Sequence, residues 1–323
     1  MPTLLERLGV EAPVVQAGMG GGIAQGALAA AVSEAGGLGT LGIMPPPAFA
    51  AELAKARQAT KRPIAVNILL NLARADHWKA ARTADAVVTY WGRPRRRTPG
   101  VWLHQVGSVG EASAARIAGA DGVIVQGVEA GGHVRGTTPA LELLAQVRDA
   151  LPDGYPLWLA GGIAEAADVR RALDAGAEAA VLGTRFLMSE ESSARKAYKQ
   201  RLMESRETVL TELFGLGWPD APHRVLWNEA TERWLRDDRR GPGWVRTINR
   251  VTGPLASRLP PSFQASALRR QSASVPFLSP QPAAEGTPSN LLDAGALYAG
   301  ECVARIHDIR PAGELVRELA AVG

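Results

Sequence analysis

The sequence predicts an α/β fold, a (β/α)8 TIM barrel with an insertion between strand eight and the C-terminal helices. Eight short apolar segments occur before residue 183, and most of the links between them have helical character. Alternating strands and helices predict a parallel sheet, and a count of eight strands predicts that the sheet closes into a barrel. The length of 323 residues suits a barrel of roughly 250 residues with an added segment.

The expected strands are short apolar runs bounded by glycine or polar turn residues. They cover residues 13–16, 37–42, 63–67, 86–89, 101–106, 122–126, 157–160 and 179–182. An alanine-rich helix that ends near Ala35 is expected first, and further helices are expected at residues 49–59, 73–82, 110–119, 138–150 and 164–175. Thr138 is the expected N-cap of the helix at 138–150, with Pro139 in its first turn.

Composition changes after residue 190, and we expect three parts. Residues 1–190 form the barrel. Residues 191–290 form an insertion, helical to about residue 225 and irregular over 236–290, which is a candidate lid. Residues 291–323 supply terminal helices, at 294–306 and 314–321, that complete the barrel.

The overall charge gives little evidence for a nucleic-acid partner. Lys+Arg number 36 and Asp+Glu 32, so the formal net charge is +4. The basic link Arg93–Arg97 is interpreted as a solvated loop. Cys302 is the single cysteine, which excludes an intramolecular disulfide and fits a reducing cytoplasm. We expect no signal peptide and no membrane span, because the chain has no basic-then-apolar start and no run of about 20 apolar residues.

The segment Gly37–Gly42 matches G-x-G-x-x-G, a fingerprint of dinucleotide-binding folds. That fingerprint requires a strand before it and a helix directly after it. Here a helix precedes the segment and three prolines follow it. We therefore interpret these glycines as a helix end and a closely packed strand.

Glycines at the ends of strands seven and eight indicate a phosphate site. Gly161 and Gly162 follow strand seven, and Gly183 and Thr184 follow strand eight. In TIM barrels these two loops are the usual place where backbone N–H groups hold a phosphate. The ligand would be a phosphorylated substrate or a cofactor with a phosphate tail, such as FMN. The alternative is that both pairs are ordinary turns.

The stretch Gln126–His133 holds an acid, two adjacent glycines and a histidine just after strand six. Gly131 and Gly132 allow a ligand close to the backbone. His133 could remove a proton from a carbon acid or donate to an oxyanion, with Glu129 orienting the loop or the imidazole. The alternative is a histidine that only caps the loop.

Two other loops could contact a ligand. Gly18 and Met19 lie in a glycine-rich loop after strand one, which is either a ligand loop or a tight turn. Asn67 ends strand three, where its amide could pair with a planar heterocycle or cap the loop. His104 lies mid-strand and is interpreted as a core histidine.

The sequence lacks H-E-x-x-H, paired C-x-x-C, Walker A and G-x-S-x-G motifs, and its five histidines show no metal-site spacing. A cofactor is therefore expected to carry the chemistry.

Four of these segments resemble the nitronate monooxygenase family, formerly called 2-nitropropane dioxygenases, which are FMN-dependent TIM-barrel flavoproteins. The segments are Gln16–Met19, Gln126–His133, Ala160–Ile163 and Leu182–Phe186, with a weaker likeness at residues 294–300. The resemblance extends from Pro13 to about Ser192.

The resemblance implies that FMN is bound at the strand ends. The phosphate would lie on Gly162, Gly183 and Thr184. The isoalloxazine would lie against Gly18 and Met19, and its polar atoms would lie near Asn67 and Gln126. Gly131, Gly132 and Gly161 would belong to the adjoining cofactor-binding loops. His133 would be the catalytic residue. In the family's reaction a nitronate gives an electron to the flavin, oxygen then reacts, and a carbonyl compound and nitrite form.

Two other functions are weighed. The same motifs occur in NAD(P)H-dependent flavin reductases that act on a quinone or an enoyl thioester. A barrel without catalysis could instead bind a ligand or a nucleic acid through the link Arg93–Arg97 and the Arg-rich insertion. We favour the monooxygenase, in the cytoplasm, with a small nitronate and O2 as partners and without nucleic acid or membrane. Assembly into a homo-oligomer is left open.

Overall fold

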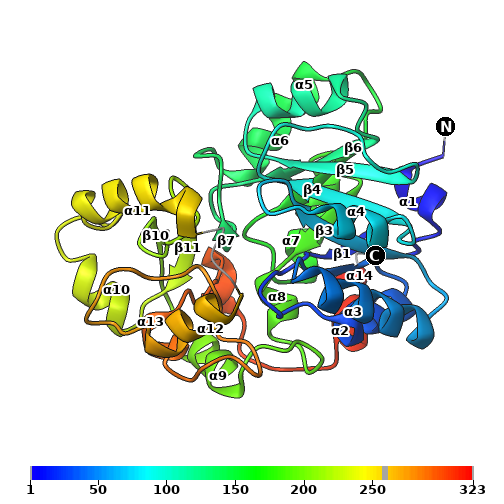
Figure 1. The fold of residues 1–323 in the computed structure, drawn as a ribbon. Coiled ribbons are helices and arrows are strands. Elements are labelled where there is room, and N and C mark those ends of the chain that lie inside the picture. The colour runs from blue at the N-terminus through cyan, green and yellow to red at the C-terminus, as the bar shows by residue number, and fades with distance from the viewer. Residues whose placement is uncertain (1, 257–260, 322–323) are drawn as a thin grey trace.

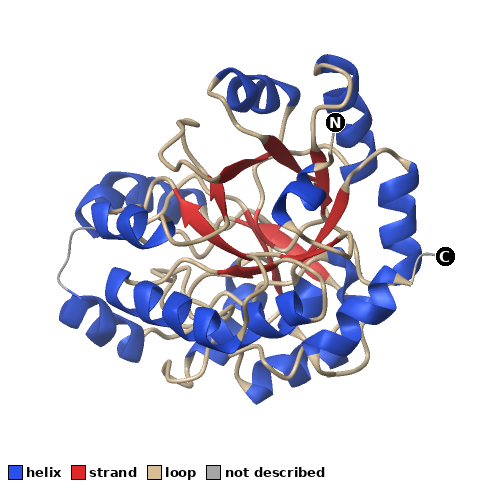
Figure 2. Cartoon of the chain, turned by 90° about the vertical axis from the view of Figure 1, so that its right-hand side faces the viewer, coloured by secondary structure: helices blue, strands red, loops and turns tan. Residues whose placement is uncertain are grey.

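The computed structural model describes residues 2–256 and 261–321. Within these ranges, eight parallel strands form one sheet in the order β1-β9-β8-β6-β5-β4-β3-β2. The sheet closes where Val15 and Leu38 form a parallel bridge and the N–H of Gln16 donates to the Leu38 carbonyl at 3.0 Å. Figure 2 shows the strands at the centre, surrounded by helices. The predicted TIM barrel is confirmed.

Each barrel strand coincides with a predicted strand to within a few residues. They are β1 (Val14–Gln16), β2 (Gly39–Leu41), β3 (Ile64–Leu69), β4 (Ala86–Tyr90), β5 (Val101–Val106), β6 (Gly122–Gln126), β8 (Leu157–Ala160) and β9 (Ala179–Leu182). Strands buried on both faces carry continuous apolar runs, and this is why the sequence showed them clearly.

Helices cover the outside of the barrel. They are α1 (Leu4–Leu8), α2 (Gly26–Glu34), α3 (Pro46–Ala59), α4 (Ala75–Ala81), α5 (Val109–Ile117), α6 (Ala140–Ala150), α7 (Ala166–Asp174), the short α8 (Thr184–Leu187) and α14 (Ala312–Ala320). The basic link between β4 and β5 has no helix and is largely exposed, as expected. Arg96 holds it to the barrel through the Gly119 carbonyl at 2.7 Å and Asp121 at 2.6 Å.

The prediction that Thr138 caps α6 is wrong. The N-cap residue is Pro139, which has no side-chain donor or acceptor. The first N–H of the helix, that of Ala140, donates instead to the carboxylate of Glu129 at 3.0 Å. A negative charge at a helix N-terminus is favourable, so a distant acid replaces the local cap.

The core has two layers. Ala65 of β3 packs inside the barrel with Val88, Ile124 and Trp158. Its neighbour Val66 points outward into a second cluster, under α3. His104 is buried on the same face of β5 as Trp102, with its Nδ1 2.8 Å from the Thr89 hydroxyl, which confirms it as a core histidine.

The Gly37–Gly42 motif serves packing. A Cβ at Gly39 would overlap the carbonyl oxygen of Ala29 in α2, and one at Gly42 would overlap that of Met19. A Cβ at Gly37 would lie 2.8 Å from the Val14 carbonyl. These approaches confirm that the glycines let β2 lie directly against α2 and the loop after β1.

A second lobe stands beside the barrel, drawn in yellow and orange in Figure 1. It contains the antiparallel sheet β10-β11-β7, formed by β10 (Thr208–Thr211), β11 (His223–Leu226) and β7 (Gly132–His133). Its helices are α9 (Lys196–Glu204), α10 (Glu229–Trp234), α11 (Gly243–Ala256), α12 (Pro261–Arg270) and α13 (Leu291–Ala294). The expectation of helix alone over residues 191–225 is wrong, because β10 and β11 lie there. Residues 236–290 were expected to be irregular, but α11 and α12 occupy much of that segment.

The prediction of a helix at residues 294–306 is also wrong. Residues 295–300 run extended beside β11, where the N–H of Leu226 donates to the Leu297 carbonyl at 2.8 Å and Val225 forms an antiparallel bridge with Tyr298. A 3-10 helix, η1 (Glu301–Arg305), follows. At Gly295 a Cβ would lie 2.9 Å from the Leu291 side chain, so the chain turns sharply there and leaves the helical path. The predicted last helix is present as α14.

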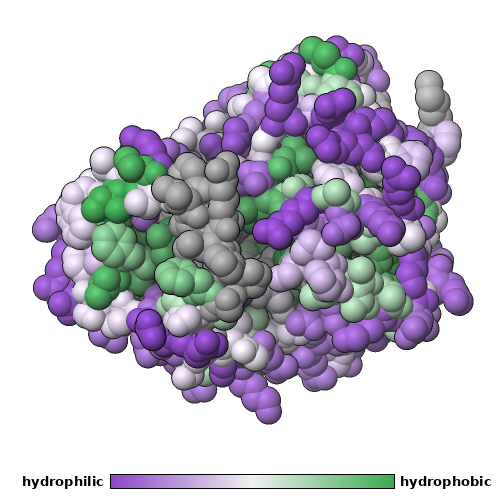
Figure 3. Space-filling model, viewed as in Figure 1, coloured by the Kyte–Doolittle hydropathy of each residue, from purple (hydrophilic) through white to green (hydrophobic). Residues whose placement is uncertain are grey.

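Large apolar side chains are exposed mainly on the second lobe. Figure 3 shows hydrophobic residues gathered over this lobe, and Trp244, Ile248 and Val251 of α11 are among the exposed ones. No helix in the described ranges is long and apolar enough to cross a membrane.

Replacing Gly39 with alanine should destabilise the barrel, because the new methyl group would overlap the α2 backbone. We expect a loss of about 1–3 kcal/mol in the free energy of unfolding, the range for overpacked cores. Urea unfolding would measure it. Gly110→Ala is the control, since a Cβ there meets only the Ser108 hydroxyl, at 4.0 Å. Equal stability of the two variants would contradict the packing account.

Candidate active site

The carboxyl ends of the barrel strands share one rim, and every predicted cofactor residue lies there or in the loop after β6. Gly18 and Met19 follow β1, Asn67 belongs to β3, Gln126 ends β6, and Gly161 and Gly183 follow β8 and β9. These strands lie side by side in the sheet, apart from β3, which faces the others across the barrel mouth. The fold therefore brings the predicted residues to the edge where TIM-barrel active sites form.

The loops after β8 and β9 provide unpaired backbone donors. In the described part of the chain, the N–H groups of Gly162 and Gly183 donate no hydrogen bond. A Cβ on Gly183 would meet only the Cβ of Ala17, at 3.9 Å, so the space in front of this residue is free of protein atoms. Gly162 has a φ of +72°, which favours glycine. The buried Thr184 hydroxyl lies beside these donors and accepts from the Gly300 N–H at 2.9 Å.

Unpaired side-chain groups lie across the mouth at β2 and β3. Asn67 is 6% exposed, and no hydrogen bond in the described residues uses its side-chain amide. The buried Thr40 hydroxyl likewise has no partner within those ranges. A Cβ on Gly18 would overlap Asn67 and would lie 3.1 Å from the Thr40 side chain, so the three residues are adjacent. Buried polar groups are normally hydrogen-bonded, so the Thr40 hydroxyl indicates a ligand at this place, which the adjacent Asn67 amide would also reach.

Gln126 is largely committed to the protein. Its Nε2 donates to the His133 carbonyl at 3.0 Å, and its Oε1 lies 2.6 Å from the Tyr90 hydroxyl. The same hydroxyl lies 3.0 Å from the His133 carbonyl. The two barrel residues thus anchor the backbone of β7, and Gln126 keeps one N–H for a ligand.

The loop between β6 and β7 is fixed from three sides. The Glu129 carboxylate binds the start of α6, so Glu129 orients the loop and not the imidazole. Arg224 of β11 donates to the Val128 carbonyl at 2.7 Å and forms an ion pair with Glu301 at 2.9 Å. A Cβ on Gly131 would lie 2.5 Å from the Gly300 nitrogen. The late segment, residues 295–300, therefore packs directly on this loop.

His133 lies in an aromatic enclosure. The indole of Trp218 stacks on its ring with centroids 3.8 Å apart. Trp91, His223 and Tyr298 contact it at centroid distances of 5.7, 5.3 and 5.7 Å. These residues come from the β4–β5 link, the second lobe and the late segment, so three distant parts of the chain build the enclosure.

The enclosure keeps the imidazole uncharged. Burial holds the pKa of His133 well below its usual value of 6.5, and the neighbouring His223 lowers that pKa further. A hydrogen bond to the Ala221 carbonyl opposes this shift in the pKa. Burial also raises the pKa of Tyr298 far above its usual value. The site therefore combines a neutral histidine and a neutral tyrosine near pH 7.

The sequence pointed to one residue of this enclosure, Tyr298, through the weaker family likeness at residues 294–300, and did not indicate the others. Trp91 lies in a link interpreted as solvated, and Trp218 and His223 lie in a stretch expected to be helical. Tyr298 was placed in a helix.

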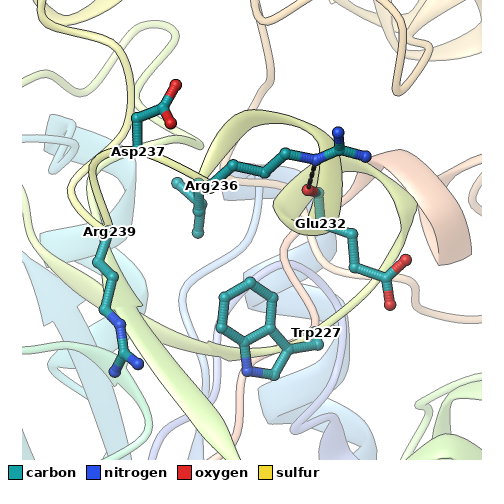
Figure 4. Close-up of a pocket in the computed structure, with 6 residues that line it drawn as sticks. Trp227, Glu232, Arg236, Asp237 and Arg239 are labelled. Atoms are coloured by element: carbon teal, nitrogen blue, oxygen red, sulfur yellow. Dashed lines mark hydrogen bonds between the residues drawn. The ribbon is translucent and has the colours of Figure 1, made fainter.

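A separate hollow of about 500 Å³ lies on the second lobe, at α10 and the turn after it. Figure 4 shows its lining, in which Arg236 donates to the Glu232 carbonyl at 3.2 Å. Arginines and acids alternate around it, and none of the predicted site residues lines it. The described residues also contain no group of three His, Cys, Asp or Glu side chains placed to hold a metal ion.

Comparison with known proteins decides the family. The model of the nitronate monooxygenase family matches residues 2–93 and 94–321. The chain belongs to this family. It is 31% identical over 285 residues to the nitronate monooxygenase of Pseudomonas aeruginosa, an alignment that covers 69% of this chain and 80% of that protein.

Other members differ in their named reactions. A (3aS,4S,5R,7aS)-5-hydroxy-7a-methyl-1-oxo-octahydro-1H-indene-4-carboxyl-CoA dehydrogenase of Mycobacterium tuberculosis is 33% identical over 260 residues, covering 76% of this chain and 71% of that protein. Nitroalkane oxidase from Streptomyces ansochromogenes superposes with a TM-score of 0.72 at 31% identity, over 98% of this chain and 96% of that one. FabK from Thermotoga maritima superposes with a TM-score of 0.76 at 26% identity, over 99% and 95%. The chain is an oxidoreductase of this flavin-dependent family.

Stability should fall as the pH drops from about 6.5 toward 4. Burial lowers the pKa of both His104 and His223 to about 4 in the folded protein. In this window the unfolded chain binds more protons than the folded one, so acid favours unfolding. Each histidine would lower the free energy of unfolding by on the order of 3 kcal/mol as the pH reaches 4. Urea unfolding at a series of pH values measures this, and His104→Asn should flatten the curve. A pH-independent free energy of unfolding would contradict the burial of both rings.

Proposed function

We propose that the chain is an FMN-dependent nitronate monooxygenase that oxidises alkyl nitronates with O2 to a carbonyl compound and nitrite. The observation that carries this proposal is the neutral His133 in its aromatic enclosure beside a rim of unpaired backbone and amide donors. Family membership and the likeness to a nitroalkane oxidase support it. Its partners are then small molecules, the nitronate and O2, and no nucleic acid.

The rim fits FMN. The free N–H groups of Gly162 and Gly183, with the Thr184 hydroxyl, suit a phosphate, which backbone donors alone can orient. The Asn67 amide and the Thr40 hydroxyl suit the donor and acceptor atoms at the edge of an isoalloxazine. Gly18 and Met19 would lie against the ring, with Gly18 packed directly on Asn67. Of Gly131, Gly132 and Gly161 in the adjoining loops, Gly132 leaves open space, because no protein atom lies within 4 Å of its Cβ position. When bound, FMN would accept electrons from the substrate and pass them to oxygen.

His133 supplies proton chemistry. A neutral imidazole can accept a proton from the carbon next to a nitro group. The imidazolium formed in this way can then donate a hydrogen bond to a nitronate oxygen. An anionic nitronate needs no proton removal, so this role matters most for neutral nitroalkanes. Trp91 and Trp218 cover part of the half-buried imidazole and leave an apolar surround, which favours a small alkyl substrate.

A second candidate is an NAD(P)H-dependent FMN reductase of a quinone or an enoyl thioester. It is favoured by the 33% identity to a carboxyl-CoA dehydrogenase and by the superposition on FabK. The rim would hold FMN equally well in that reaction. The enclosure around His133 favours the small substrate of the first candidate.

Gly183→Val should abolish FMN binding while the barrel stays folded. The valine side chain would enter the space in front of Gly183, where the nearest protein atom is 3.9 Å away. The residue has a φ of −99°, which valine can adopt. Fluorescence titration with FMN should show at least a hundredfold weaker binding, and circular dichroism should be unchanged. Normal FMN affinity in this variant would refute the phosphate position.

His133→Asn should lower turnover of a neutral nitroalkane by about 10²–10⁴-fold, the usual contribution of a general base. Turnover of the pre-formed nitronate should fall much less, since no proton must be removed. Nitrite release and oxygen uptake measure both rates, and the flavin absorbance should show that FMN stays bound. Equal losses with both substrates would rule out the role of His133 as a base.

A further inference from the structure

Two histidines lie next to each other on adjacent strands of the second sheet. His133 of β7 pairs with His223 of β11 in antiparallel register, and their ring centroids lie 5.3 Å apart. Both Nδ1 atoms approach one acceptor, the carbonyl oxygen of Ala221, at 3.3 Å for His133 and 2.9 Å for His223. A carbonyl oxygen has two lone pairs and can accept from both rings.

The tautomer of His223 follows from its two neighbours. The backbone N–H of Phe214 points at its Nε2 at 3.3 Å, so Nε2 must be the acceptor. The Ala221 carbonyl can only accept, so Nδ1 must carry the proton. Both nitrogens of this buried ring are thus satisfied in one arrangement, with Nδ1 protonated.

The tautomer of His133 follows from a similar comparison. Its Nδ1 faces the Ala221 carbonyl, which can only accept. Its Nε2 lies 3.4 Å from the Tyr298 hydroxyl, which can donate or accept. A lone pair on Nδ1 would repel the carbonyl, whereas the hydroxyl adapts to either state of Nε2. Protonation on Nδ1 is therefore the arrangement that satisfies both nitrogens.

The Tyr298 hydroxyl has a second acceptor, the Pro280 carbonyl at 2.7 Å. It can donate to Nε2 of His133 or turn to Pro280. A substrate that takes Nε2 would therefore leave the tyrosine proton with a partner, which avoids the cost of an unpaired buried hydroxyl.

The backbone around this pair is strained. Asp220, directly before Ala221, has a φ of +54°, and Trp91, in contact with His133, has a φ of +60°. These are the two non-glycine residues with positive φ in the described ranges. Such strain costs of order 1–3 kcal/mol per residue and is concentrated where a fold must present a group in one direction. Here the turn at Asp220 directs the Ala221 carbonyl at the two rings.

We propose that His223 is a positioning residue of the active site: together with the Ala221 carbonyl it holds His133 as the Nδ1–H tautomer, so that Nε2 is the nitrogen that exchanges protons with the substrate. The role of His133 in catalysis rests on the proposed function, whereas the tautomer itself does not.

The direct test is nuclear magnetic resonance of the FMN-loaded chain labelled with 15N-histidine, near pH 7. Long-range 1H–15N spectra distinguish a protonated from an unprotonated ring nitrogen, and comparison with His133→Gln assigns the His133 signals among the five histidines. We expect a protonated Nδ1 and an unprotonated Nε2. A protonated Nε2 would overturn the proposal. Because no turnover is needed, this result stands apart from any failure of the proposed reaction.

Two variants test the part played by His223. Asparagine at this position can still donate from near the Nδ1 site, whereas leucine cannot. The Nδ1–H of His223 fixes the direction of the Ala221 carbonyl, which the leucine variant would release. We therefore expect His223→Leu to shift His133 toward the Nε2–H form and to lower kcat/KM for a neutral nitroalkane about tenfold, or ~1.4 kcal/mol. His223→Asn should keep the tautomer and most of the activity. An unchanged His133 tautomer in a folded His223→Leu protein would refute the positioning role.

Discussion

The pairing of β7 with β11 is the interaction on which the site depends. β7 is two residues long and could not persist as a strand alone. The barrel holds it from one side through Gln126 and Tyr90, which both reach the His133 carbonyl. The second lobe holds it from the other side through β11. His133 therefore lies at the junction of the two lobes, and its environment is set by both.

The barrel rim and the enclosure of His133 have different tasks, which are cofactor binding and control of the imidazole. The barrel rim presents rigid backbone donors and two unpaired polar side chains, which suits a large planar cofactor with a phosphate. The second lobe, the segment of residues 295–300 and Trp91 of the β4–β5 link supply the rings around His133, and their packing lowers its pKa by burial. FabK and a nitroalkane oxidase, which have different named reactions, superpose on nearly the whole chain, so the fold alone does not fix the reaction.

The sequence predicted the barrel well and the enclosure poorly. Buried parallel strands carry their signal locally, in runs such as Gly122–Gln126, and the glycine motifs at the rim are local too. The enclosure depends on contacts between residues far apart in the chain. Trp218 contacts His133 only because β11 pairs with β7, and no local pattern encodes that pairing. The strand β11 itself was missed because its four residues lie between irregular segments.

The same contrast applies to single residues. Asn67 and the glycines after β8 and β9 were placed near a ligand from sequence, and the structure leaves their polar groups unpaired at the rim. Glu129 was given two alternative roles, and only the fold shows that its carboxylate serves the α6 N-terminus. Gln126 was expected to face the cofactor, but most of its amide is used to anchor β7.

The most direct test of the account is an anaerobic titration of the purified FMN-loaded protein, first with an alkyl nitronate and separately with NADH and NADPH, followed by the flavin absorbance. The account predicts that the nitronate bleaches the flavin and that neither pyridine nucleotide does so. Bleaching by a pyridine nucleotide alone would contradict the monooxygenase and establish the reductase in its place.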